Sequence, residues 1–165
     1  MAFEVRQFGD PVLKSRSTPV KEFDDSLQHL ADEMLETMRE HDGVGLAGNQ
    51  VGRLKRILVA ATEDEEFVIV NPELSPTTEE TAIEVEGCLS IPGIHVEVER
   101  PTAVTLTGHD AEGTPVRVEA SGLLARIFQH ELDHLNGVTI LDRTDRESRK
   151  EAMRLLRERL LAKRS

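Results

Sequence analysis

The sequence predicts an α+β fold, with mostly antiparallel sheets packed around a central buried motif helix and further helices on the N-terminal and C-terminal sides. Short alternating segments are grouped between helical ones, which favours antiparallel pairing over βαβ units. One helical segment, residues 122–135, is apolar around most of its circumference, which is typical of a buried helix. The length of 165 residues suits one core and is short for two, so residues 1–165 are expected to form a single domain.

Each element is expected from its own pattern. A first helix should run from about Asp25 to His41, because an apolar stripe recurs there at helical spacing. The strands expected next are Ile57–Ala61, Phe67–Asn71, Ala82–Val85, Ile94–Val98, Ala103–Thr107 and Val116–Ala120. The buried helix follows, with Ser121 as its expected cap and Gly137 as its expected stop. A C-terminal helix is expected from about Asp145 to Ala162.

The buried helix carries the segment His130-Glu131-Leu132-Asp133-His134, whose spacing is typical of a metal site. Positions four apart share one face of a helix, so His130 and His134 can bind one ion with two imidazoles. Glu131 is then free to exchange a proton with a metal-bound water. The alternative is that both histidines are ordinary core or surface residues, but buried polar groups need partners, and a metal supplies one. The segment therefore indicates metal-assisted hydrolysis without naming a substrate.

A catalytic metal needs a third protein ligand, and the chain has one cysteine, Cys88. A lone cysteine is often only a small buried hydrophobe, and a single thiol cannot form an intrachain disulfide. Its neighbours favour a ligand, because Gly87 allows close backbone approach and residues 90–93 are typical of a turn. The other histidines belong to an expected surface helix or to polar strands and are weaker candidates.

Three segments resemble, in the right order, the signature motifs of the peptide deformylase family. They are Gly43-Val44-Gly45-Leu46-Ala47-Gly48-Asn49-Gln50, Glu86-Gly87-Cys88-Leu89-Ser90 and His130-Glu131-Leu132-Asp133-His134-Leu135. Each motif alone is weak or moderate, but three in order with the sole cysteine in the required place are highly specific, and the resemblance runs over essentially the whole chain. One departure is Gly48, where the family more often has alanine. The missing methyl group is expected to loosen the loop.

The resemblance implies a metal-dependent hydrolase that removes the formyl group from the N-terminal formyl-methionine of nascent polypeptides and releases formate. It implies that Cys88, His130 and His134 are the metal ligands and that Glu131 is the general base and acid. It also implies that Gln50 and the backbone N–H of Leu89 are the oxyanion donors. These roles suit a reaction in which a water loses a proton and the former formyl oxygen becomes negative. The family points to Fe²⁺, while the ligand types also admit Zn²⁺, Ni²⁺ or Co²⁺.

The resemblance also suggests how the substrate is held. It makes Gly45 a backbone contact for an extended peptide and Val44 part of the methionine side-chain pocket. Leu123 and Ile127 are further pocket candidates, because they lie two turns and one turn before the ligand face of the helix. Plain core positions are the alternative for both.

Two arginines are also expected near the site. Arg126 lies one turn before the first motif histidine, so it is either a substrate contact or a side chain that extends to solvent. Asp133 is buried by helix phase and, like Glu86, needs a cationic or N–H partner. Arg100 is the candidate partner for one or both carboxylates.

The charge of the chain is unevenly distributed. A net charge of −11 argues against general nucleic-acid binding, but nine basic and five acidic residues from Leu141 onward give a local +4 and leave −15 elsewhere. The basic residues at helical spacing in this part are Arg143, Arg146, Lys150, Arg154 and Arg157. A solvated surface helix is the ordinary explanation, whereas the family resemblance suggests contact with ribosomal RNA near the peptide exit.

Other classes of protein are less well supported. No apolar run approaches a membrane span, and the N-terminal residues lack a signal-peptide layout, so a cytoplasmic protein is expected. A His-Glu-x-x-His peptidase would usually take Glu or His as its third ligand. A non-catalytic metal-holding or ribosome-associated protein would need neither Glu131 nor Gln50, and this chain keeps both. The oligomeric state is not predicted.

Overall fold

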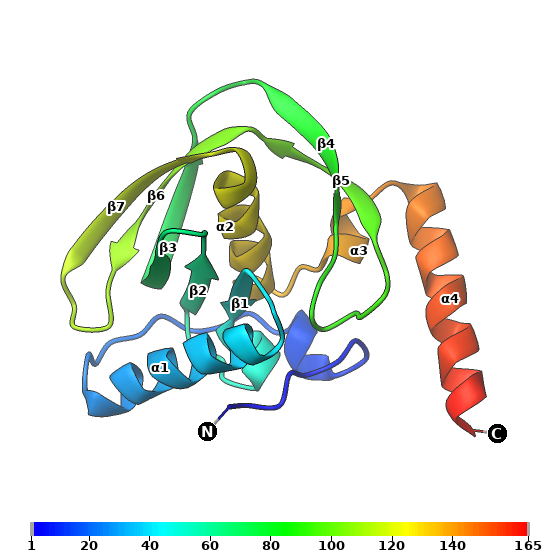
Figure 1. Cartoon of the computed structure of the whole chain (residues 1–165), viewed down its shortest axis with the longest axis horizontal. Helices are drawn as coiled ribbons and strands as arrows, with labels where there is room; N and C mark the ends of the chain where they lie inside the picture. Colours follow the sequence, from blue (N-terminus) through cyan, green and yellow to red (C-terminus); the bar gives the residue numbers. More distant parts are fainter. Residues whose placement is uncertain (1, 165) are drawn as a thin grey trace.

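The computed structural model describes residues 2–164 and has the predicted α+β architecture (Figure 1). The strands are β1 (Gly45–Ala47), β2 (Ile57–Ala61), β3 (Glu66–Pro76), β4 (Thr81–Glu86), β5 (Val96–Pro101), β6 (Ala103–His109) and β7 (Pro115–Ser121). The helices are η1 (Pro11–Lys14), α1 (Asp25–Glu40), η2 (Gly48–Val51), α2 (Gly122–Leu135), α3 (Ile140–Arg143) and α4 (Arg146–Arg164). One antiparallel sheet has the order β1-β2-β3-β6-β7, and a second pairs β4 with β5.

Strand β2 lies at the centre of the main core because both of its faces are buried. Leu58 and Ala60 pack in one apolar cluster with Phe128 of α2. Ile57 and Val59 point the other way and pack in a second cluster with the apolar stripe of α1. Alternate side chains of a strand face opposite sides, so α1 and α2 cover opposite faces of the five-stranded sheet.

Helix α2 is the predicted motif helix, but its ends differ from the prediction. Leu123 is 65% exposed because the first turn borders an open pocket, whereas Phe128 is fully buried. Ser121 occupies the cap position, but its side chain makes no cap hydrogen bond, so the predicted serine cap is wrong. The predicted stop is confirmed, since Gly137 has a φ of 77° and its N–H donates to His134 O over 3.0 Å.

The predicted strands are present, with differences at their ends. β2 has the predicted bounds, while β5 begins at Val96 rather than Ile94 because residues 91–95 belong to the turn that follows Cys88. Strand β1 and helix α3 were not predicted. They have three and four residues, which is too short to reveal a hydrophobic period.

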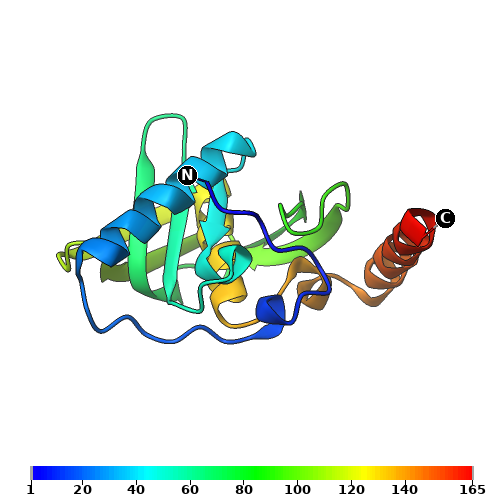
Figure 2. The same ribbon diagram turned by 90° about the horizontal axis from the view of Figure 1, so that it is seen from below.

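Helix α4 stands at one side of the molecule (Figure 2), and apolar residues of this helix pack against the rest of the protein. Ala152, Met153 and Leu156 pack in a third cluster with Ile91 and residues of β5 and α3. The outer side is charged, as the sequence predicts, and its basic residues include exposed ion pairs with glutamates one turn away. No helix within residues 2–164 is long and apolar enough to cross a membrane.

Asp142 joins α3 to the N-terminal part of the chain, and its carboxylate provides a test of stability. It accepts hydrogen bonds from Lys14 Nζ at 2.5 Å, Thr139 N at 2.9 Å and Arg149 at 3.2 Å. Burial raises the pKa of Asp142, but these donors outweigh it and lower the pKa from 3.8 to about 2.

We expect Asp142→Asn to reduce the free energy of unfolding by about 1–2 kcal/mol at pH 7. A carboxylate with a lowered folded-state pKa stabilises the fold above its unfolded pKa of 3.8, and this contribution disappears as the pH falls towards 2. Urea unfolding of both proteins at pH 7 and at lower pH measures the effect. A difference that stayed constant down to pH 2 would contradict the assignment.

Candidate active site

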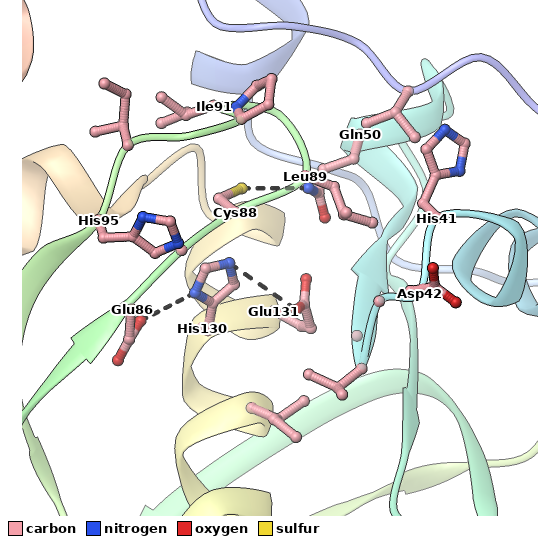
Figure 3. Close-up of a pocket in the computed structure, with 18 of the residues that line it drawn as sticks. His41, Asp42, Gln50, Glu86, Cys88, Leu89, Ile91, His95, His130 and Glu131 are labelled. Atoms are coloured by element: carbon pink, nitrogen blue, oxygen red, sulfur yellow. Dashed lines mark hydrogen bonds and ion pairs between the residues drawn. The ribbon is translucent and has the colours of Figure 1, made fainter. Parts of the chain in front are cut away.

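Cys88, His130 and His134 converge where the turn after β4 meets α2, as Figure 3 shows for the first two. Cys88 Sγ lies 3.3 Å from His134 Nε2, which lies 3.2 Å from His130 Nε2. Their ligand atoms lie within 4.8 Å of one another, and no second such group occurs within residues 2–164. Burial raises the pKa of the Cys88 thiol, but the two neighbouring histidines outweigh it and hold the pKa well below its usual value.

These donors fit a divalent metal ion. One thiolate and two imidazoles are common ligands of zinc, iron and related ions, and three protein ligands leave a position open for water or substrate. The two Nε2 atoms and the sulfur point at a common centre rather than at separate partners. The His130 Nδ1 atom is occupied by Glu86 Oε1 at 3.0 Å, which leaves Nε2 free to bind the ion.

Glu86 connects His130 to two buried arginines. Arg100 donates to both Glu86 oxygens, at 2.6 and 3.0 Å, and Arg126 donates to Oε2 at 2.6 Å. Burial raises the pKa of Glu86, but hydrogen bonds from His130 and Arg100 outweigh it and lower the pKa to about 2. Glu86 therefore stays ionised and fixes the orientation of the His130 ring.

The expected role of Arg100 is confirmed. Besides Glu86, it donates to Asp133 Oδ2 at 2.9 Å, so it serves both predicted carboxylates. Asp133 also receives two hydrogen bonds from Arg143 of α3, at 2.8 and 3.0 Å. The part of Arg143 in this network was not predicted, because its position in a basic stripe suggested a solvated side chain.

Glu131 lies beside the ligand atoms and is 4% exposed. Its Oε2 atom is 4.0 Å from His130 Nε2, and its Oε1 atom is buried without a hydrogen-bond partner among the described residues. Burial raises the pKa of Glu131, although electrostatic interaction with the neighbouring histidines opposes the rise. Gly45 of β1 makes room for this carboxylate, because a Cβ on Gly45 would overlap Glu131 Oε2. A buried carboxylate with a raised pKa is suited to accept and return a proton.

Gln50 reaches the same centre from η2. Its Oε1 atom accepts a hydrogen bond from Ala47 N at 3.0 Å, which fixes the side-chain amide. The Nε2 group donates to Ser90 Oγ at 3.1 Å and lies 3.5 Å from Cys88 Sγ. The amide N–H groups therefore lie beside the ligand set, and Leu89 contributes to the wall of the same pocket.

The pocket above this centre has a volume of about 770 Å³. The structure places all the predicted substrate residues in its lining: Val44, Gly45, Leu123, Arg126 and Ile127. Val44 and Leu123 are exposed at its mouth, at 49% and 65%, while Ile127 is buried at 5%.

Arg126 differs from the other predicted substrate residues because it carries a charge. Its guanidinium group donates to Val98 O and Ala82 O, each at 2.9 Å, as well as to Glu86. It is 7% exposed, so the alternative that it extends to solvent is wrong. The contacts describe a side chain that fixes the pocket wall and the Glu86 carboxylate.

Other residues of the pocket wall were missed. Gln7, His41, Asp42 and His95 line it, with His41 and Asp42 on the opposite side from His95 (Figure 3). His95 lies against Gly87, where an added Cβ would be 3.0 Å from its ring. These residues come from distant parts of the chain and share no motif, so only the three-dimensional structure brings them together.

Gly48 leaves no room for a methyl group. A Cβ there would lie 2.7 Å from the carbonyl oxygens of both Arg53 and Lys55. The prediction of a loosened loop is therefore wrong, because the backbone itself fills the space of the missing methyl. Gly48 O also accepts a hydrogen bond from Arg53 N at 2.9 Å.

We expect Gly48→Ala to lower the free energy of unfolding by about 1–3 kcal/mol, the usual cost of overpacking a buried site. Neither close contact is with a flexible side chain, so relief requires movement of the backbone next to Gln50. Urea unfolding, with an unchanged dependence on denaturant, measures the loss. A variant as stable as the parent would show that the loop relaxes without cost.

The fold and the site together define the class of metal-dependent hydrolases, with a Cys-His-His cluster that could bind a metal ion beside a buried glutamate. The family model of polypeptide deformylase matches residues 2–150. The chain therefore belongs to the polypeptide deformylase family. It is a metal-dependent enzyme that removes the formyl group from the N-terminus of nascent polypeptides.

Relatives with known names and solved structures support the same family assignment. Peptide deformylase 1 of Corynebacterium glutamicum is 50% identical over 158 residues, which cover 93% of this chain and 94% of that protein. The crystal structure of peptide deformylase from Thermotoga maritima is 43% identical with a TM-score of 0.85, and the alignment covers 88% of this chain and 99% of that one. A Synechococcus elongatus peptide deformylase in complex with actinonin is 42% identical, with a TM-score of 0.87 and coverage of 92% and 84%.

Proposed function

We propose that Cys88, His130 and His134 hold the catalytic metal ion and that Glu131 is the general base and acid of deformylation. The observation that carries this proposal is the convergence of three ligand atoms within 4.8 Å, beside a buried Glu131 oxygen that has no partner among the described residues. We further propose Fe²⁺ as the physiological ion, because it suits a thiolate and two imidazoles, while Zn²⁺, Ni²⁺ and Co²⁺ satisfy the same ligand types.

Each of these residues then has its own role in the hydrolysis. A divalent ion, when bound, supplies a nucleophilic water of lowered pKa near neutral pH. Glu131 accepts the proton of the attacking water and donates it to the departing amine. Gln50 Nε2 and the Leu89 N–H stabilise the negative charge that develops on the former formyl oxygen, an interaction worth about a hundredfold to a thousandfold in turnover per donor.

The lining of the pocket supports a proposal for how the rest of the substrate is held. Ile127, Val44 and Leu123 offer apolar surface for the methionine side chain, and the Gly45 backbone lies where an extended peptide can approach it. Arg126 supports this wall through its bonds to Glu86 and to backbone carbonyls.

We further propose where the enzyme works and what it contacts. We place the enzyme in the cytoplasm, where formylated chains are made, and propose that the basic side of α4 contacts the ribosome. The local excess of positive charge from Leu141 onward supports this contact, because phosphate groups attract such a surface. We also propose that residues 1–165 form one catalytic domain.

Formate release from formyl-Met-Ala-Ser, with protein purified without oxygen and assayed for metal, tests the proposal. We expect release with about one metal ion per chain, inhibition by a chelating hydroxamate, and no release of acetate from acetyl-Met-Ala-Ser. Cleavage of a peptide bond instead of formate release would favour a peptidase. Bound metal without either product would favour a non-catalytic binding protein.

Cys88→Ser tests the third ligand. A hydroxyl is a harder and weaker ligand than a thiolate, so we expect the bound metal per chain to fall or its identity to change, with slower formate release. Metal analysis and the formate assay on the same preparations measure both effects. Full metal content with full activity would remove Cys88 from the site.

A further inference from the structure

A second groove adjoins the active-site pocket, between the turn after Cys88 and helix α4. Its volume is about 510 Å³. Gly93, Ile94 and His95 line both the pocket and this groove. His95 therefore stands on the boundary between them, so a peptide that leaves the active site past this side chain would enter the groove.

The groove is held in place by hydrogen bonds on both sides of its helical wall. Thr144, just before α4, donates to Glu97 O over 2.6 Å. Arg159, further along the helix, donates to Pro92 O. These bonds fix α4 against the segment that carries His95. The two walls of the groove are therefore hydrogen-bonded to each other.

The lining of the groove combines an apolar floor with acidic side chains. Ile94, Val96 and Ala152 are buried beneath it, at 2%, 5% and 3% exposure. Glu147 and Glu151 of α4 line its wall. Glu151 is paired with Arg154 at 2.5 Å, which weakens its attraction for a further cation. A lysine or arginine side chain matches this surface, because its aliphatic stem covers apolar atoms while its charge meets the carboxylates.

We propose that this groove receives the part of the nascent chain that follows the formyl-methionine and favours basic residues there. The inference rests on the proposed function, because it needs a peptide anchored in the adjoining pocket. The growing chain is far longer than the residues that the pocket itself holds, so its continuation must cross the surface beside the site. The groove gives that continuation a path and the enzyme a sequence preference beyond methionine.

The test uses formylated octapeptides that begin Met-Ala-Ser and carry either lysines or glutamates at positions four to seven. We expect the kcat/KM of the lysine peptide to be about three- to fivefold higher than that of the glutamate peptide at low salt, mainly through a lower KM. The effect is small because exposed charge pairs contribute little free energy. The preference should shrink as salt is added. In the double variant Glu147→Gln/Glu151→Gln it should fall below about twofold.

The matched control is Glu112→Gln/Glu119→Gln. Glu112 lies in the turn between β6 and β7, and Glu119 lies on β7, so this variant removes the same charge away from the groove. It should keep the lysine preference of the parent. Equal loss in both double variants would assign the preference to the overall negative charge, and no preference in the parent would remove the groove from the substrate path. Either result would overturn the proposal.

Two further measurements separate this proposal from the proposed function. Formate release from formyl-Met-Ala-Ser reports on the catalytic assignment alone, since that tripeptide is too short to occupy the groove. Fluorescence anisotropy of labelled, unformylated octapeptides reports on groove binding without turnover. Tighter binding of the lysine peptide that depends on the two glutamates supports the groove even if no formate is released, and equal binding of both peptides overturns it.

Discussion

Glu131→Gln should reduce kcat for formate release by about a hundredfold to ten-thousandfold, the range that general acid–base catalysis provides. Glutamine keeps the shape of the side chain in the space beside Gly45 but cannot accept the water proton. The metal content should stay at the parental level, because Glu131 is not one of the three converging ligands. Steady-state kinetics and metal analysis of the same preparation measure both quantities.

Glu84→Gln is a matched control for this result. It makes the same chemical change on β4, where the Glu84 side chain is 61% exposed and pairs with Nε of the buried Arg126 at 3.2 Å. We expect it to keep parental turnover within about a factor of two, as for most exposed ion pairs. Loss of metal from the Glu131 variant, or turnover close to the parent, would overturn the division of roles between ligands and base.

Glu86→Gln should lower the free energy of unfolding by about 3–5 kcal/mol, the usual cost of removing one partner from a buried charge pair. The Arg100 and Arg126 guanidinium groups would stay buried without the carboxylate that neutralises them. The same change weakens the hydrogen bond that orients His130, so metal affinity should fall about tenfold to a hundredfold. Urea unfolding and competition with a metal-binding dye measure the two losses.

The two effects of Glu86→Gln can be separated. Unfolding of metal-free protein reports on the arginines alone, while dye competition at low temperature, in folded protein, reports on His130. Glu84→Gln again serves as the control, because it lies two residues away on the same strand and contacts Arg126 without burial of its own carboxylate. Equal small effects of the two variants would show that the Glu86 network stabilises neither the fold nor the ligand.

Much of the fold follows from local sequence patterns. Helix α1 and strand β2 were predicted because the sequence pattern of each extends over at least five residues. Short elements such as β1 and α3 have no period, and the start of β5 depends on a turn set by long-range packing. Leu123 was predicted either as a pocket residue or as plain core, and it is exposed because the pocket opens beside it.

The candidate site divides in a similar way. Ligand types and spacing predicted Cys88, His130 and His134, and the structure brings them together. The need of buried carboxylates for cations predicted Arg100. Neither argument could find Arg143 or His95, because their roles depend on where α3 and the turn after Cys88 lie in space. The exact ion and the contribution of each substrate contact stay predictions.

The proposed metal site lies between two parts of the protein that have separate apolar clusters. His130 and His134 stand on α2, which packs with the five-stranded sheet, while Cys88 packs with the cluster of β5, α3 and α4. Cys88 and His134 are 46 positions apart in the chain. An ion bound by both closes that loop much as a disulfide would, and loop closure of this length restricts the unfolded chain. With the proposed ligands, a protein with a single thiol would have a reversible cross-link, and loss of the ion would release both the chemistry and the connection.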